Sequence, residues 1–553
     1  MHILALHEDS NANATLFRDG KILFSVAEER FTRVKHQGGF PKESLKFILE
    51  KFAISLDDID VVLCGNKYHP LPRILGDRFP TFEHSFLGPS QKLSLYYQHA
   101  LYKSKLLRTL VEKLNRSVLK RKFGKPVSMV DHHAAHAYSA YMTSGFDEAV
   151  TITTDNYGDG LSSAVFVCKN GKCSMIQSSS ALNSPGQYYG ELAQLLGFHP
   201  LMAGKMTGLA AYGDPHKAYG LVKGLFGLTE DKKDFVLPSL FFKSVSGNVF
   251  RKLKEYKKED VAAAAQRRFE EVMLEYVTEA IKSAGSSNVA LAGGIYGNVR
   301  LNQKISELDT VNEVFVHPGM SDQGISMGVG LKYLALNGNL KPFRLKNVYF
   351  GSRYNNKDIE SALKGSGTDF EYCEDIEKKV ANILSEGKVV ARYADGLEYG
   401  PRALGNRSIL YQTTDRSVND WLNKKLNRSE FMPFAPVTLD EYAEKCYKNV
   451  AKGKYTARFM TISFDCTELM KEMSPGVIHL DGTARPQILN EESNPSYYRI
   501  LKEYHKITGI PSLINTSFNM HEEPIVNTPE EAIRAFKAAG LDYLAAGNYL
   551  IKK

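Results

Sequence analysis

The chain has 553 residues, too many for one hydrophobic core, and its 43% hydrophobic and 24% charged residues are typical of a globular protein. No apolar run reaches the roughly 20 residues that span a bilayer, and the N-terminus lacks the pattern of a signal peptide. The six cysteines are scattered without the spacing of a metal site or a disulfide framework. We therefore expect a cytoplasmic protein without a membrane partner.

Two stretches of the chain share the order strand, polar turn, strand, Asx-Gly turn, strand. The first stretch comprises residues 3–6, 14–17 and 21–27, with the turn Asp19-Gly20. The second comprises residues 150–154, 162–167 and 173–177, with the turn Asn170-Gly171. An Asx-Gly pair between apolar runs predicts a β-hairpin. The repetition predicts a duplicated domain. Its layout resembles that of the actin-like ATPase superfamily, and this resemblance implies a mixed α/β architecture with a nucleotide between two lobes.

Residues 103–125 form a basic amphipathic pattern. Only Glu112 opposes the cations of this stretch, which are Lys105, Arg108, Lys113, Arg116, Lys120, Arg121 and Lys122. Apolar residues, among them Leu106, Leu110 and Leu114, recur at helical spacing. We expect a helix with a solvated basic face over a buried apolar stripe. Contact with nucleic acid or another anionic ligand is the alternative.

A histidine cluster follows at Asp131 to His136. His132 and His136 are one helical turn apart, so both imidazoles can face one point. Asp155 closes the strand at 150–154 and brings a carboxylate to its end. Two imidazoles and a carboxylate suit a divalent transition metal. The alternative is a helix whose histidines only pack or cap.

Glycine-rich turns come after three of the predicted strands. Gly158 and Asp159 follow Asp155, and glycines at such positions let backbone N–H groups approach an anion. Residues 288–291 lead into Gly293, Gly294 and Asn298, and residues 313–316 lead into Asp322. Strand, glycine turn and helix in this order predict a nucleotide or phosphate site. Asp322 is a candidate further metal ligand.

The composition changes at residues 337–356, and we expect domains at 1–345 and 346–553. The second domain sets Arg402 and Arg407 among glycine, proline and other small residues. Guanidinium groups match phosphate oxygens two at a time, so we expect a phosphoanhydride or acyl-phosphate site rather than a purely structural role. The remaining candidates for this site are Lys425, Arg428, Arg485, Asn515, Ser517 and Asn519.

Over nearly its whole length the chain resembles the O-carbamoyltransferases, which include nodulation-factor carbamoyltransferases and enzymes that tailor antibiotics. The shared motifs occupy residues 28–36, 132–137, 204–213, 400–408, 433–436 and 515–519. The resemblance implies an N-terminal domain of the actin-like ATPase superfamily and a YrdC-like α/β C-terminal domain. It implies that carbamoyl phosphate and ATP form a carbamoyl-adenylate, whose carbamoyl group passes to a hydroxyl of a small-molecule natural product.

The resemblance also implies an ion at His132, His136, Asp155 and Asp322, with iron expected and manganese or magnesium as alternatives. Many relatives carry a histidine base in the first turn, where this chain has Ser10 and Asn11. His7 is a substitute base, and a metal that lowers the hydroxyl's pKa is the alternative. Lys425 and Arg428 depart from the commonest family pattern.

We expect the acceptor near the first hairpin and residues 28–36, where Arg30, Arg33 and Lys35 form a basic rim. Neutralisation of these bases by Glu28 and Glu29 at a structural turn is the alternative. The runner-up function is a tRNA threonylcarbamoyl-type modification enzyme, which the basic helix favours. A non-catalytic actin-like protein is the third interpretation. Nucleic acid is otherwise not an expected partner, and a homodimer is left open.

Overall fold

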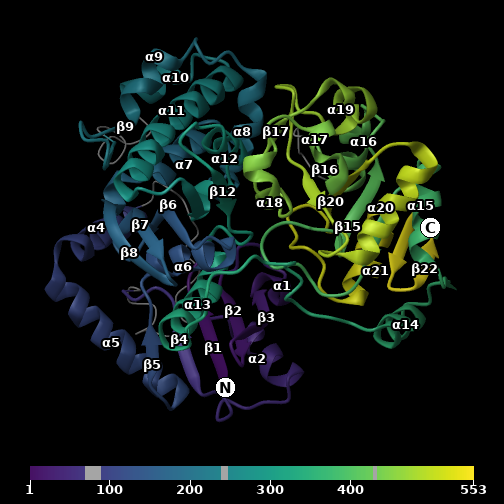
Figure 1. The fold of residues 1–553 in the computed structure, drawn as a ribbon, viewed down its shortest axis with the longest axis horizontal. Helices are drawn as coiled ribbons and strands as arrows, with labels where there is room; N and C mark the ends of the chain where they lie inside the picture. Colours follow the sequence, from purple (N-terminus) through teal and green to yellow (C-terminus); the bar gives the residue numbers. More distant parts are fainter. Residues whose placement is uncertain (69–88, 238–246, 428–432) are drawn as a thin grey trace. The chain divides into compact units, whose positions relative to one another are not determined.

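The structure is a computed structural model that describes residues 1–68, 89–237, 247–427 and 433–553. The chain folds into two compact units (Figure 1). The first unit comprises Met1–Leu23 and Gln37–Arg344, and the second comprises Phe24–His36 and Leu345–Lys553. The boundary after Arg344 lies beside the position expected near residue 345. Phe24–His36, which we had assigned to the first domain, belongs to the second unit.

The first unit contains two five-stranded sheets of the same strand order, β3-β2-β1-β4-β5 and β8-β7-β6-β11-β12, and the last residues of β3, from Phe24 on, are counted in the second unit. In each sheet the central strand pairs antiparallel with its hairpin partner and parallel with the strand on its other side. The strands are β1 (His2–His7), β2 (Asn13–Arg18), β3 (Lys21–Ala27), β4 (Val61–Cys64), β5 (Val127–Met129), β6 (Glu148–Gly158), β7 (Leu161–Lys169), β8 (Lys172–Ser180), β11 (Asn288–Ala292) and β12 (Glu313–Val316). This repetition confirms the duplicated-lobe α/β fold.

The two hairpins owe their turns to the predicted Asx-Gly pairs. Asp19 and Gly20 have φ of 52° and 77°, and Asn170 and Gly171 have φ of 52° and 74°. Left-handed conformations at both central residues match the twist of a two-residue β-hairpin, and Asn, Asp and Gly adopt them at little cost. The predicted hairpins are therefore confirmed.

Two helices form a layer between the sheets. Helix α6 (His132–Ser144) packs on β6 and β11, helix α13 (Ile325–Asn337) packs on β1 and β2, and the two helices pack on each other. A Cβ at Gly328 would overlap the carbonyl oxygen of Ala135, so glycine allows this close approach. The Asp131 side chain caps α6 by accepting a hydrogen bond from Ala134 N at 3.0 Å. The N-termini of both helices thus meet the ends of the central strands.

Further helices cover the outer faces of the first unit. Helix α11 packs on α7, α8, α12 and β6. These further helices are α2 (Lys42–Lys51), α4 (Pro89–Lys103), α5 (Lys105–Phe123), α7 (Pro185–Leu195), α8 (Gly204–Leu209), α11 (Lys258–Ala284) and α12 (Val299–Ser306). No helix in the described ranges is long and apolar enough to cross a membrane.

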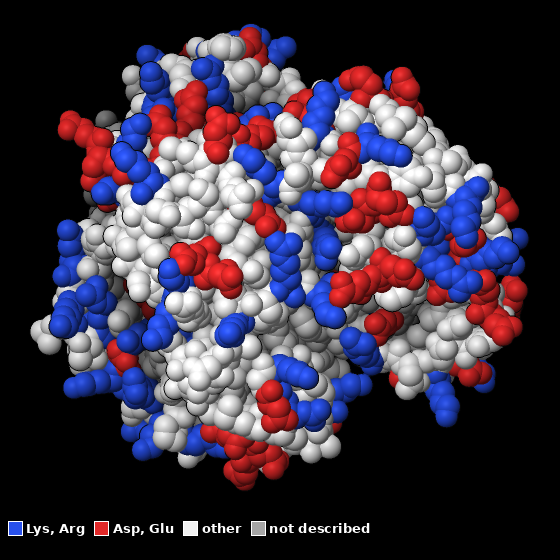
Figure 2. Space-filling view, viewed as in Figure 1, with Lys and Arg blue, Asp and Glu red and all other residues white. Residues whose placement is uncertain are grey.

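Helix α5 corrects one expectation. Its buried residues are Asn115, Leu119 and Phe123, whereas Leu106 and Leu110, which we expected in the buried stripe, are 81% and 54% exposed. The helix packs on β5 and α4, and these contacts turn the face with Leu119 inward. Figure 2 shows lysine and arginine side chains grouped at the lower left, where Figure 1 draws α5. The outer face is therefore basic and apolar together.

The cysteines correct another expectation. We predicted no disulfide, but Cys168 and Cys173 form one. They occupy directly opposite positions on β7 and β8, flanking the predicted hairpin turn. Because the hairpin register sets this pairing, the spacing along the chain did not reveal it. Four other described cysteines, Cys64, Cys373, Cys446 and Cys466, form no disulfide.

The second unit is built on one mixed eight-stranded sheet of order β13-β22-β21-β14-β15-β20-β16-β19. Its strands are β13 (Glu371–Tyr372), β22 (Tyr549–Lys552), β21 (Tyr543–Ala546), β14 (Val390–Tyr393), β15 (Arg407–Gln412), β20 (Ser512–Ser517), β16 (Ala435–Leu439) and β19 (Gln487–Leu489). Helices α15 (Ile376–Ser385) and α20 (Pro495–Thr508) pack together and share a core with the sheet. Helices α14 (Asn356–Gly365) and α21 (Pro529–Ala539) form a second pair. The expected α/β class is confirmed for this unit too.

Candidate functional site

The four side chains predicted as metal ligands lie together in the first unit. One ligand atom from each lies within 4.8 Å of all the others. His136 Nε2 is 3.4 Å from Asp155 Oδ2 and 3.6 Å from Asp322 Oδ1. His132 Nε2 is 3.7 Å from Asp322 Oδ1. These separations exceed the roughly 2.7–2.9 Å of a charge-assisted hydrogen bond and suit ligands that face a common point.

His132 is held both by its backbone and by its ring. Its backbone N–H donates to Asp159 Oδ2 at 2.8 Å, and its Nδ1 lies 2.7 Å from Asn66 Oδ1. A Cβ at Gly158 would overlap the imidazole, so glycine makes room for the ring. The ring therefore keeps one orientation, with Nε2 toward the cluster.

The two carboxylates are held from different sides. Ser10 Oγ donates to Asp322 Oδ2 at 2.9 Å, and Asn13 Nδ2 donates to the Asp322 carbonyl oxygen at 2.8 Å. Asp155 Oδ2 accepts a hydrogen bond from Gly294 N at 2.9 Å. The turn between β1 and β2 and the glycine turn after β11 thus position the ligands, although the glycine turn was predicted to bind phosphate.

The cluster favours a positive charge. Burial lowers the pKa of His136, but Asp155 and Asp322 outweigh burial and raise that pKa to about 9. Burial, and then the neighbouring His136, lower the pKa of His132 to about 3, so this imidazole is neutral. Burial and the Asp155 carboxylate raise the pKa of Asp322. A neutral imidazole beside two carboxylates that retain a cation is the electrostatic setting of a metal site.

The donor set fits a divalent ion. His132 Nε2, His136 Nε2 and Asp322 Oδ1 are buried and have no hydrogen-bond partner among the residues that the structure describes. Buried polar atoms are normally paired, so three unpaired atoms facing one point call for a shared partner. Nitrogen and oxygen ligands of this kind suit iron, manganese or zinc.

Asp159, which was predicted to help bind a nucleotide or phosphate, accepts hydrogen bonds from the protein backbone. Besides the His132 amide, its carboxylate accepts hydrogen bonds from Lys67 N and Tyr68 N, each at 2.8 Å. The side chain is only 7% exposed. Three backbone donors already occupy the carboxylate, so we assign it to fixing α6 against the segment after β4 rather than to a nucleotide.

Residues of the turn after β11 also have structural roles. Gly293 has φ of 106°, and a Cβ there would overlap the backbone of Thr154. Asn298 Oδ1 accepts a hydrogen bond from Leu301 N at 3.1 Å and so caps α12. Gly294 presents its N–H to Asp155, as described above. Of these predicted cofactor residues, Asn298 is buried and committed to its helix.

The catalytic candidates of the first hairpin surround Asp322. His7 is completely buried, its Nε2 is 3.2 Å from the Ser10 carbonyl oxygen, and burial lowers its pKa to about 4. Asn11 has φ of 56°, and its carbonyl oxygen accepts a hydrogen bond from Asn13 Nδ2 at 2.7 Å. Lys35 is exposed and belongs to the second unit, so the structure does not group it with the other three.

Arg30 and Arg33, two of the three residues expected to form a basic rim, bind partners within the second unit. Arg30 is 3% exposed and donates to the Gly400 carbonyl oxygen at 3.1 Å. Arg33 donates to the Ile525 carbonyl oxygen at 2.9 Å and pairs with Glu531 at 3.1 Å. Both guanidinium groups therefore attach Phe24–His36 to the rest of the second unit. The expectation that they form a basic rim for the acceptor is wrong.

Two arginines of the second unit carry unbalanced charge. Neither Arg402 nor Arg485 has an ion pair or hydrogen bond within the described ranges, and Arg402 Nε is buried. Burial lowers the pKa of Arg402 to about 10. Burial and the charge of Arg402 lower the pKa of Arg485 well below its usual range. Two neighbouring guanidinium groups without a partner among the described residues are a candidate anion site, and the predicted phosphate binding by these residues stays a prediction.

Asn515 ties the segments of this site together. Its Nδ2 donates to the Ala403 carbonyl oxygen at 3.2 Å and to Gln487 Oε1 at 2.7 Å. Its buried Oδ1 has no partner in the described part of the chain. Ala403 adjoins Arg402, and Gln487 is two residues after Arg485. Asn515 therefore stays with these arginines in the candidate anion site.

Arg407 differs from Arg402, although both were predicted to bind phosphate. Its side chain is completely buried and donates to the carbonyl oxygens of Ala394 and Asp395. Its guanidinium carbon lies 3.8 Å from the centre of the Tyr393 ring. The structure thus commits Arg407 to holding the ends of β14 and β15 together.

The remaining candidates of the second unit are Lys425, Asn519, Ser517 and Arg428. Lys425 Nζ is 3.4 Å from the Gly540 carbonyl oxygen and 3.8 Å from Asp542. Asn519 Nδ2 donates to two carbonyl oxygens of its own turn. Ser517 is half-buried on β20 opposite Ser408 of β15. Arg428 lies outside the described residues.

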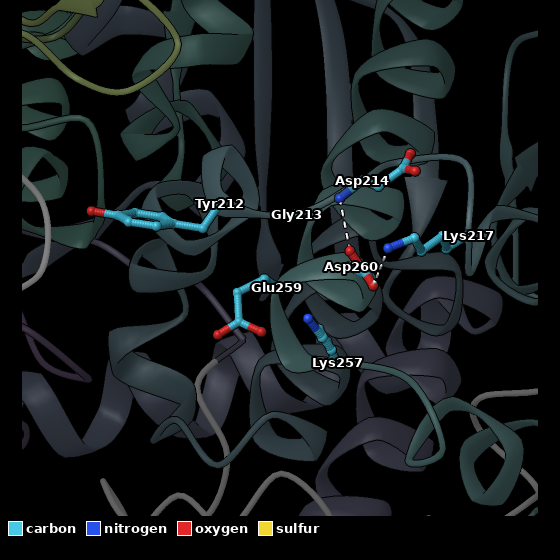
Figure 3. Close-up of a pocket in the computed structure, with 7 residues that line it drawn as sticks. All are labelled: Tyr212, Gly213, Asp214, Lys217, Lys257, Glu259 and Asp260. Atoms are coloured by element: carbon cyan, nitrogen blue, oxygen red, sulfur yellow. Dashed lines mark hydrogen bonds and ion pairs between the residues drawn. The ribbon is translucent and has the colours of Figure 1, made fainter.

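A polar cavity of about 610 Å³ lies between residues 212–217 and 257–260, at the end of the motif 204–213 (Figure 3). Asp260 accepts a hydrogen bond from Asp214 N at 2.8 Å and pairs with Lys217 at 3.4 Å. A Cβ at Gly213 would overlap the Glu259 carbonyl oxygen, which explains the glycine that closes the motif. The cavity is lined by three carboxylates and two lysines and does not include the metal candidates.

Two residues that contact the candidate sites were not predicted from the sequence. Asn66 contacts His132 and Asp9, and Glu398 accepts three backbone hydrogen bonds from the loop that carries Arg402. Asn66 follows the strand β4 and a glycine, the position of the polar candidates after β1 and β6. The rule that polar residues at strand ends gather at one edge could have found it.

The comparisons with known proteins agree over both units. The carbamoyltransferase N-terminus model matches residues 2–331, and the carbamoyltransferase C-terminus model matches residues 381–553. The uncharacterised protein MJ1051 of Methanocaldococcus jannaschii is 32% identical over 100% of this chain and 99% of its own. Nodulation protein NolNO of Sinorhizobium fredii is 30% identical over 98% of this chain and 78% of its own.

A solved structure of full-length HypF covers 62% of this chain and 56% of its own at 16% identity and a TM-score of 0.37. The family models together match most of the chain, and the curated relatives match nearly all of it. The chain belongs to the carbamoyltransferase family and is a carbamoyltransferase.

Proposed function

We propose that the enzyme is an ATP-dependent O-carbamoyltransferase with one reaction step in each unit. In the second unit, water cleaves carbamoyl phosphate to carbamate and inorganic phosphate. A carbamate oxygen then attacks the α-phosphate of ATP, which gives carbamoyl-adenylate and releases pyrophosphate. In the first unit, the hydroxyl of a small-molecule acceptor attacks the carbamoyl carbon, and AMP leaves. The acceptor oxygen gains the carbamoyl group and loses its proton.

The observation that carries this proposal is that Arg402 and Arg485 are neighbours and that neither has a partner in the part of the chain that the structure describes. Negative charge builds on the α-phosphate during attack, and preorganised guanidinium groups offset it without having to be desolvated at that moment. Because the two cations repel each other in a buried setting, an anion between them also relieves their own strain. Asn515 holds together the segments that carry the two arginines.

In the first unit, His132, His136, Asp155 and Asp322 would hold a divalent ion, with iron as the proposed identity. When bound, such an ion supplies charge stabilisation for phosphate and carbonyl oxygens. The chain's own residues orient these ligands: Ser10 and Asn13 fix Asp322, and Gly294 fixes Asp155. Their task is to hold the reacting groups in one geometry.

Pyrophosphate release from ATP and carbamoyl phosphate, measured without acceptor, tests the division of labour. We expect Arg402→Ala and Arg485→Ala each to lower release by about 10²–10³-fold, as for the loss of one oxyanion donor. His136→Ala should retain release and lose transfer. Arg499→Ala is the matched control, because Arg499 is 53% exposed and pairs with Asp375 at the surface. Equal loss in His136→Ala and Arg402→Ala would overturn the two-site proposal.

The tRNA-modifying alternative relies on α5. Phosphate contacts need cations at the centre of the exposed face, whereas Leu106, Leu110 and Leu114 are 81%, 54% and 44% exposed there. Carbamoyl transfer to a small molecule is therefore the function we favour. A screen of hydroxylated compounds by mass spectrometry, with ATP and carbamoyl phosphate supplied, identifies the acceptor.

A further inference from the structure

Asn66 lies at the C-terminal end of β4 and faces the metal candidates without being one of them. The residue is 4% exposed and has φ of 55°, a left-handed conformation that asparagine tolerates. A Cβ at the preceding Gly65 would overlap the Ile325 side chain, so the chain passes close to the start of α13. Packing therefore fixes the backbone that carries the Asn66 amide.

The hydrogen bonds of Asn66 define which way its amide points. Its Nδ2 donates to the carboxylate oxygen Oδ2 of Asp9 at 3.2 Å, and a carboxylate accepts only from a donor. Its Oδ1 consequently faces His132 Nδ1 at 2.7 Å. An amide oxygen cannot donate, so Nδ1 of His132 carries the proton in this contact.

The position of that proton decides what His132 offers to the cluster. With Nδ1 protonated in the neutral ring, Nε2 has a free lone pair, and Nε2 is the atom 3.7 Å from Asp322 Oδ1. A histidine ligand with its second nitrogen held by an acceptor binds metal in one tautomer and one orientation. His136 differs, since its Nδ1 has no hydrogen-bond partner among the described residues.

We propose that Asn66 is a positioning residue of the metal centre, which acts by holding His132 in the tautomer that presents Nε2. This inference rests on the proposed metal site and adds a residue outside its ligand set. The Asp159 contact fixes where His132 begins α6, and the Asn66 contact fixes its ring. The carboxamide oxygen is the atom that matters.

Titration of the metal-stripped, full-length protein with Co²⁺ tests this. Asn66→Gly removes the side chain and keeps the left-handed backbone at no cost, and it should weaken Co²⁺ binding by about 10–100-fold. Asn66→Asp keeps an acceptor for Nδ1–H, loses the donor to Asp9, and should retain Co²⁺ affinity. Asn170→Gly, at an exposed turn with φ of 52°, is the matched control and should bind as the unaltered protein does.

A spectroscopic measurement separates positioning from a general loss of structure. In metal-free protein labelled with ¹⁵N at histidine, His132 should give the Nδ1–H pattern, assigned by its absence in His132→Gln. Asn66→Gly should lose that single pattern, and Asn66→Asp should restore it.

Each alternative result is informative. Unchanged Co²⁺ affinity in Asn66→Gly overturns the role of Asn66 while leaving the metal site intact. Equal weakening in Asn66→Asp and Asn66→Gly also overturns it, because the acceptor would then be irrelevant. Absence of Co²⁺ binding in the unaltered protein instead overturns the metal site of the proposed function, and the role of Asn66 with it.

Discussion

Substitution of Glu398, a residue of the second unit, should lower the free energy of unfolding strongly. Its side chain is 2% exposed, and its Oε1 accepts hydrogen bonds from Leu404 N, Asn406 N and Arg407 N at 2.9, 2.8 and 3.0 Å. One oxygen thus closes the loop that carries Arg402. Substitution by alanine leaves three buried N–H groups without an acceptor.

The free energy of unfolding should fall by about 3–5 kcal/mol in Glu398→Ala. Each orphaned buried donor costs roughly 1–3 kcal/mol, but the three share one acceptor and their costs do not add in full. Removal of a buried carboxylate also relieves its desolvation, which offsets part of the loss. Glu398→Gln keeps an oxygen acceptor and gives up only its charge, so about 1–2 kcal/mol is expected, since neutral hydrogen bonds are roughly half as strong.

Urea unfolding followed by tryptophan fluorescence measures the free energy of unfolding of the second unit. Trp421 is the single tryptophan of the chain and lies on α16 (Val418–Lys425), with its indole N–H donating to Asp415 at 2.8 Å. The control is Glu386→Ala, at an exposed glutamate after α15. A loss below about 1 kcal/mol in Glu398→Ala, or a larger loss in Glu398→Gln, would refute the reasoning.

Other expectations follow from the same structure. Gly158→Ala should abolish metal binding by displacing the His132 ring, while Gly297→Ala, whose added Cβ meets nothing within 4 Å, should not; metal analysis of both decides. Filter binding of tRNA at two salt concentrations should give only weak, salt-sensitive retention, and tight binding would revive the tRNA alternative. Peptide mapping under non-reducing conditions should link Cys168 to Cys173, and free thiols at both would contradict the hairpin pairing.

Local patterns in the sequence predicted the parts of the fold that depend on neighbours along the chain. The spacing of His132 and His136 and the Asx-Gly turns are set within a few residues, and they came out as expected. Asp322 was reached from the repeated order of strand, turn and helix. Each of these predictions needed only period, turn chemistry and repetition.

Local patterns could not distinguish residues of the same type that have different tertiary contacts. Arg402 and Arg407 occupy the same glycine-containing stretch, yet Arg407 meets the carbonyl oxygens after β14 and Arg402 lies near Arg485. The leucines of α5 share one period, and the packing on β5 decides which of them are buried. Asn66 carries no periodic pattern at all. These outcomes depend on partners far along the chain.

The sequence left His7 and the metal as alternative means of activating the acceptor, and the geometry weighs against His7. Its ring is completely buried, and the hydroxyl of the nearby Ser10 donates a hydrogen bond to Asp322. His7→Gln keeps an N–H donor toward the Ser10 carbonyl oxygen but removes the titrating ring. We therefore expect transfer by His7→Gln to stay within about tenfold of the unaltered enzyme, below the 10²–10⁴-fold effect of a lost general base. Transfer assayed with preformed carbamoyl-adenylate isolates this step, and a loss of a hundredfold or more would return the role of base to His7.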